Sequence, residues 1–78
     1  MNAADFLASK RLTQMMVAKK LGCTRANVSL WFSGETSPNV ATIERLTNAL
    51  NDLGADTNYT EVFNALWQTR QERKKEGK

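Results

Sequence analysis

Histidine is absent from this 78-residue sequence, and cysteine and proline occur once each. A single cysteine cannot form an internal disulfide, and without histidine it leaves no zinc-binding set. The sequence also lacks a glycine-rich phosphate loop and a nucleophile with a partner base. These absences predict no metal, no cofactor and no enzymatic activity.

Long apolar runs are also missing, and none approaches the roughly 20 residues that a membrane-spanning helix needs. The first residues lack the basic start and apolar stretch of a secretory signal. Cys23, as a lone cysteine, is typical of a reducing compartment. We therefore expect a cytoplasmic protein without membrane association, built as one domain with a small core.

The net charge of +3 is small, but it is unevenly distributed. Residues 6–34 include five basic side chains and no acidic one, whereas residues 35–69 include five acidic side chains and one basic. Residues 70–78 add five basic and two acidic side chains. A positive surface formed by the first segment would attract a polyanion, although charges on ordinary solvated helix faces give the same pattern.

Helix signals predict three short helices in the first half of the chain, over about residues 3–11, 14–21 and 25–33. Asn2, Thr13 and Thr24 are suitable N-caps for them. Gly22 and Gly34 suit the left-handed position that follows a helix. The second and third helices are therefore expected to flank a tight turn.

Two further helices are expected in the second half. Pro38 sits where it can begin the fourth, whose apolar residues follow the 3.6 period: Val40, Ile43, Leu46, Ala49 and Leu50. Asn58 and Glu61 have the spacing of a capping box for the fifth helix. Its expected anchors are Val62, Phe63, Leu66 and Trp67. The predicted fold is an all-α compact bundle of about five short helices, with residues 1–69 as the domain and residues 70–78 as a basic, fraying helix end or tail.

Residues 14–32 resemble the helix-turn-helix unit of the phage repressor and Cro family. The structural positions that carry the resemblance are Val17, Ala18, Leu21, Gly22, Val28 and Trp31. Ala18 supplies a small side chain where the two helices approach, and Gly22 supplies a residue that takes a positive φ. The resemblance extends over about residues 3–53 and implies a lambda-repressor-like DNA-binding domain.

The family places its second motif helix in the major groove, so the resemblance implies that residues near the start of that helix contact bases. Carried over by position, they are Arg25, Ala26, Asn27, Ser29 and Leu30. Arg25 either pairs with guanine or holds a phosphate, and Asn27 either pairs with adenine or bonds locally. Leu30 departs from the usual polar residue, and it either touches a thymine methyl group or is a tolerated surface residue.

Phosphate contacts are expected at helix starts and in the loop before the fourth helix. The expected residues are Gln14, Thr24, Thr36, Ser37 and Asn39, although such residue types occur in any turn. A second departure is inside the fold, where Leu7 and Phe32 stand at positions that carry an ion pair in many relatives. We expect the two side chains to pack in its place.

The resemblance implies a regulator of transcription that binds double-stranded DNA in a sequence-specific way. The expected type is a small repressor of phage, mobile-element or antitoxin kind, acting as a homodimer on a palindromic site through the fifth helix or residues 51–59. A toxin or other protein partner stays open. The alternative is a protein-interaction module that uses Met15, Met16, Leu30 and Trp67. For the methionines the favoured expectation is that one packs against the first helix, and for Trp67 that it is buried with Phe63.

Overall fold

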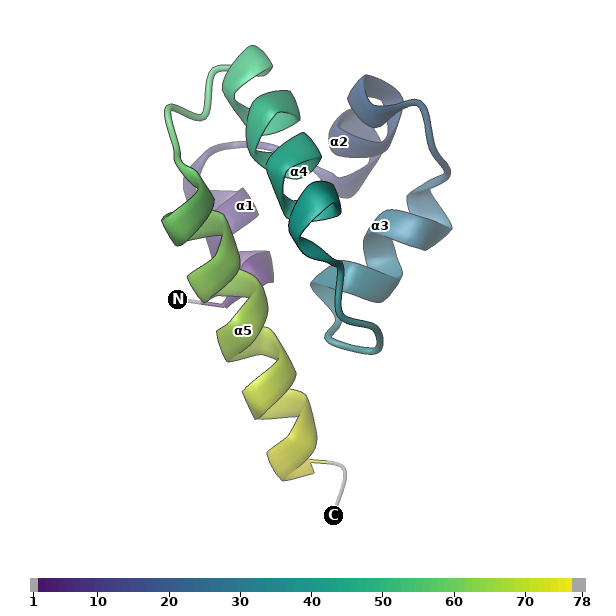
Figure 1. Cartoon of the computed structure of the whole chain (residues 1–78), viewed down its shortest axis with the longest axis vertical. Coiled ribbons are helices and arrows are strands. Elements are labelled where there is room, and N and C mark those ends of the chain that lie inside the picture. Colours follow the sequence, from purple (N-terminus) through teal and green to yellow (C-terminus); the bar gives the residue numbers. More distant parts are fainter. Residues whose placement is uncertain (1, 77–78) are drawn as a thin grey trace.

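The computed structural model describes residues 2–76, with side chains described through residue 73. It contains five helices in these residues and no strand, which confirms the all-α prediction. The helices are α1 (Ala3–Ser9), α2 (Gln14–Leu21), α3 (Arg25–Phe32), α4 (Val40–Asp52) and α5 (Tyr59–Glu76). In Figure 1, α4 crosses the middle of the bundle between α5 on one side and the α2–α3 pair on the other.

A side-chain cap begins each helix. The side-chain oxygens of Asn2, Thr13, Thr24 and Asn39 each accept a hydrogen bond from the backbone N–H three residues later. Asn58 does the same for α5, accepting from the Glu61 backbone N–H at 2.9 Å. Four of these caps were expected, because capping depends only on nearby residues.

The start of α4 differs from the expectation. Pro38 does not begin this helix, because Asn39 is extended and its Oδ1 accepts from the Thr42 N–H at 2.8 Å, so that α4 starts at Val40. The capping box of α5 is also only half formed. The Glu61 carboxylate accepts a hydrogen bond from the Thr57 hydroxyl at 2.7 Å.

The ends of the first two helices depend on residues with positive φ. α1 ends at Ser9 and not at Arg11, because Arg11 has a φ of 59° and the next N–H, that of Leu12, donates back to Leu7. Gly22 ends α2 with a φ of 75°, as expected of a glycine at this position.

One core of buried side chains joins all five helices. Its largest fully buried members are Leu46, Leu50, Val17, Val28 and Val62. Leu7 and Phe32 are also buried in this core, and their direct contact with each other stays a prediction.

Several apolar side chains expected inside are exposed. Phe63 is 41% exposed and Trp67 is 54% exposed, because α5 turns Val62, Ala65 and Leu66 toward the core. The expectation of buried anchors at 63 and 67 was therefore wrong. The same holds for Val40, which is 62% exposed in the first turn of α4.

The two methionines of α2 are exposed as well. Met15 is 51% and Met16 38% exposed, since Val17 and Ala18 occupy the inward positions of this short helix. Neither methionine belongs to the buried core, and the contact of one of them with α1 stays a prediction.

The beginning of the chain is attached to α5 by hydrogen bonds. The buried hydroxyl of Thr69 accepts a hydrogen bond from the Ala3 N–H at 2.6 Å and donates to the Ala65 carbonyl at 3.0 Å. One turn on, Glu72 accepts from the Asn2 amide at 3.0 Å. The helix passes residue 70 and continues to Glu76, and residues 77–78 of the predicted tail lie outside the described residues.

Candidate nucleic-acid interface

The α2–turn–α3 unit has the local geometry that its residues predict. The N–H groups of Gly22 and Cys23 both donate to the Ala18 carbonyl, at 2.9 and 3.0 Å, which folds the chain back immediately after α2. Ala18 is only 2% exposed. Of the other motif positions, Val17 and Val28 are buried, while Leu21 and Trp31 are half-buried against the core.

The outer face of α3 is open to solvent. Arg25, Ala26, Asn27 and Leu30 are exposed, and Ser29 is half-buried. The inner face of the same helix holds Val28 at 0% and Phe32 at 5% exposure. Four of the five expected base-contacting residues are therefore exposed on α3, and the fifth, Ser29, is half-buried on the same helix.

The polar groups at the start of α3 are available to a ligand. Within the described residues, the Arg25 guanidinium takes part in no ion pair or hydrogen bond. Asn27 contributes its backbone N–H to the Thr24 cap at 3.3 Å, whereas its side-chain amide makes no bond in the described part of the chain. Among the described residues, the Asn27 side chain therefore makes no local hydrogen bond, and its role toward DNA stays a prediction.

The expected phosphate-contacting residues lie at helix starts and in the α3–α4 loop. Gln14 is the first residue of α2 and is half-buried, and Thr36 and Ser37 are exposed in the loop. The caps Thr24 and Asn39 use a side-chain oxygen as acceptor. Their hydroxyl and amide hydrogens can still donate to an anion, at a helix end that carries partial positive charge.

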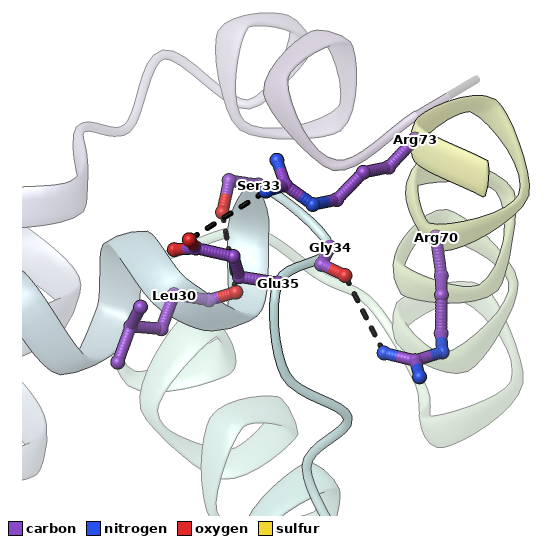
Figure 2. A network of polar contacts seen from close by, with 6 residues as sticks. All are labelled: Leu30, Ser33, Gly34, Glu35, Arg70 and Arg73. Atoms are coloured by element: carbon purple, nitrogen blue, oxygen red, sulfur yellow. Dashed lines mark hydrogen bonds and ion pairs between the residues drawn. The ribbon is translucent and has the colours of Figure 1, made fainter. Parts of the chain in front are cut away.

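One set of contacts was not foreseen from the sequence. It joins the end of α3 to α5 through Gly34, Glu35, Arg70 and Arg73, and we call it the α3–α5 junction (Figure 2). The Arg70 guanidinium donates to the Gly34 carbonyl at 3.4 Å, and Arg73 pairs with Glu35 at 3.5 Å. The junction holds the C-terminal end of α3, leaving the start of the helix uncovered.

The backbones approach closely at this junction. Gly34 has a φ of 83°, and a Cβ atom there would lie 3.1 Å from both the Arg70 Cα and the Thr69 carbonyl oxygen. Gly34 was recognisable in the sequence as a helix-ending residue. Its contact with Arg70, 36 positions later, was not recognisable, because no local pattern links the two segments.

The described residues include no group of three or more metal-ligating side chains. In the same part of the chain, none of the helices has the length and apolarity needed to cross a bilayer.

Comparison with known families agrees with this geometry. A family model described as helix-turn-helix matches residues 5–56. The match covers α2, α3, α4 and most of α1, and it ends before α5 begins. Comparison with curated proteins and with solved structures found no match.

Proposed function

This chain belongs to the helix-turn-helix family of DNA-binding transcription regulators, and from that premise we propose that it is a sequence-specific repressor. It inserts α3 into the major groove of double-stranded DNA. The observation that carries the proposal is the exposure of Arg25, Ala26, Asn27 and Leu30 on α3. The same helix is anchored in the core by Val28 and Phe32. A helix anchored in this way reaches into a groove without losing its own packing.

Arg25 is the principal specificity residue in this proposal. Its guanidinium has the fork that matches O6 and N7 of guanine, and no intramolecular acid competes for it among the described residues. The Asn27 amide is proposed to pair with adenine, and Leu30, 37% exposed, to contact a thymine methyl group. Ala26 and Ser29 complete the surface that faces the bases.

Phosphate contacts are proposed to orient the domain on the duplex. The contacting residues are Gln14, Thr24, Thr36, Ser37 and Asn39. Contacts with the DNA phosphate backbone set the register and orientation of a protein on the duplex without reading its sequence. The proposed residues lie both before and after α3 in the chain, which suits a helix held across one groove.

The finer proposal is a small repressor of phage or mobile-element type, or the antitoxin of a toxin–antitoxin pair. Because α3 has only eight residues, one copy reads a few base pairs. We therefore propose a homodimer on a palindromic site, with its half-sites about one helical turn, roughly 34 Å, apart.

Binding to random-sequence duplex DNA at increasing salt tests the proposal. A regulator of this kind binds duplex DNA at low salt. The logarithm of its binding constant then falls linearly with the logarithm of the salt concentration, with a slope of about −0.9 per phosphate contacted. Selection of bound sites from a random duplex library should then return palindromes. Failure to bind any duplex at low salt would refute the proposal and favour a protein-interaction module, for which the exposed Met15 and Met16 would supply contacts.

A further inference from the structure

A negative charge stands where the proposed phosphate contacts begin after α3. In residues 33–39, which link α3 to α4, Glu35 is the one charged residue. It directly precedes Thr36 and Ser37, and all three side chains are exposed. Because a carboxylate beside a phosphate contact repels DNA, a loop that binds the DNA backbone needs a partner for this charge.

The partner comes from α5. The Arg73 guanidinium lies 3.5 Å from the Glu35 carboxylate, and each of the two side chains is 51% exposed (Figure 2). Arg70, three positions earlier, shares this face of α5 and lines a recess with Thr36 and Ser37. The structure therefore brings two basic side chains of α5 to the loop that is proposed to contact phosphates.

The shape of the loop does not depend on the pair of Arg73 and Glu35. The backbone N–H groups of Glu35 and Thr36 both donate to the Leu30 carbonyl, at 3.1 and 3.3 Å. An ion pair as exposed as this one contributes little stability of its own. Arg73 can therefore leave Glu35 while the loop keeps its backbone hydrogen bonds.

A DNA phosphate offers Arg73 the same kind of partner as Glu35 does. The planar guanidinium binds the oxygens of a carboxylate and of a phosphate alike. Neighbouring Cα atoms are only about 3.8 Å apart, so a phosphate held by Thr36 would lie close to Glu35. Glu72, next to Arg73 in the chain, accepts instead from the Asn2 amide at 3.0 Å. Among the described side chains, Glu35 is therefore the acid that competes with a phosphate for Arg73.

We infer that Arg73 is a phosphate contact of the DNA complex, and that Glu35 holds it in the free protein. On docking, the guanidinium exchanges the Glu35 carboxylate for the phosphate that Thr36 approaches. The inference rests on the proposed function, and it adds a residue of α5 to a DNA surface that otherwise lies within residues 5–56, the family match. Because phosphate contacts carry no sequence information, Glu35 lowers the affinity for every duplex alike.

The salt dependence of binding to random-sequence duplex DNA tests the role of Arg73. The logarithm of the binding constant is plotted against the logarithm of the salt concentration. Arg73→Gln should make this plot shallower by about 0.9, the value for one phosphate contact. Arg73→Lys should keep the slope of the unaltered chain, because a lysine also neutralises a phosphate.

Lys20→Gln is the matched control for Arg73→Gln. Lys20 also belongs to an exposed ion pair, in which its Nζ lies 3.8 Å from the Asp52 carboxylate. Asp52 is the last residue of α4, so it lies about 20 Å along that helix from the Asn39 cap. Loss of this charge should therefore leave the slope unchanged.

The slope also separates a phosphate contact from a purely structural role. Circular dichroism verifies that each variant is folded, and binding is measured well below its Tm. If Arg73 only supported the loop, Arg73→Gln would lower stability or affinity and leave the slope as it is. An unchanged slope, or an equal change in Arg73→Gln and Lys20→Gln, would overturn the inference.

A second pair of variants tests the competition by Glu35. Glu35→Gln should raise the affinity for random duplex DNA by about 1.5–5-fold, the range that corresponds to releasing an exposed ion pair. Asp52→Asn is its control, because it also removes one negative charge from an exposed ion pair but lies far from the loop. Its affinity should stay near that of the unaltered chain. Equal affinities of the two variants would refute the competition.

Binding of the unaltered chain at low salt separates this inference from the proposed function. A chain that binds duplex DNA with the same slope before and after Arg73→Gln refutes the Arg73 contact alone. A chain that binds no duplex refutes the proposed function and this inference with it.

Discussion

Gly34→Ala should destabilise the domain much more than the same change at Gly22. Both glycines have positive φ, 83° and 75°, so alanine suffers a backbone penalty of about 1–2 kcal/mol at either position. Their surroundings differ. A Cβ at Gly22 meets no atom within 4 Å, whereas at Gly34 it would lie 3.1 Å from the Arg70 Cα and the Thr69 carbonyl oxygen.

The magnitude follows from that difference. Backbone atoms of a packed helix cannot move aside cheaply, and overpacking of this kind costs about 1–3 kcal/mol. At both sites, the lower conformational entropy of the unfolded alanine variant offsets about 0.4–1 kcal/mol of this destabilisation. Gly34→Ala should therefore cost about 3 kcal/mol and Gly22→Ala about 1 kcal/mol.

Thermal unfolding followed by circular dichroism is the assay. With about 4–8 °C of Tm per kcal/mol for a domain of this size, Tm should fall by about 12–24 °C for Gly34→Ala and about 4–8 °C for Gly22→Ala. Urea unfolding should give the same order without a change in the m-value. Equal losses of stability at the two sites would refute the close approach of α5 to the end of α3.

Three further changes test other parts of the structure. Arg25→Ala should lower the affinity for the selected DNA site by about 5–150-fold and leave Tm unchanged. Titration with several duplexes checks this, and an equal loss of affinity on every sequence would assign Arg25 to a phosphate contact instead. Ala18→Leu should unfold the domain, because this 2% exposed position has no room for three more carbons; a stable variant would contradict the packing of α2. Thr69→Val should cost about 1–3 kcal/mol by leaving the buried Ala3 N–H without its acceptor, while Thr60→Val, at an exposed position of the same helix, should change stability little in urea unfolding.

The importance of α5 was hard to see from the sequence. It lies outside the segment that matches the helix-turn-helix family, yet it holds α1 through Thr69 and α3 through Arg70. Each of these contacts joins residues more than 30 positions apart. Local spacing carries no information about such pairs, because they form only after the helices have packed.

The faces of α5 show the same limit. Val62, Phe63, Leu66 and Trp67 are all apolar, and all four fall on one broad stripe of the helix. The structure buries Val62 and Leu66 and exposes Phe63 and Trp67. A helical pattern with a surplus of apolar residues does not specify which of them turn inward.

The sequence by itself determined four of the five helix starts, the turn at Gly22 and the helix that carries Arg25, since a cap, a left-handed glycine and a 3.6 period act within a few residues of each other. Only the tertiary structure decided that the end of α3 lies against Arg70 and that Phe63 and Trp67 of α5 stay exposed. Those features depend on how close-packed helices divide a small core among themselves, and that division is a property of the whole molecule.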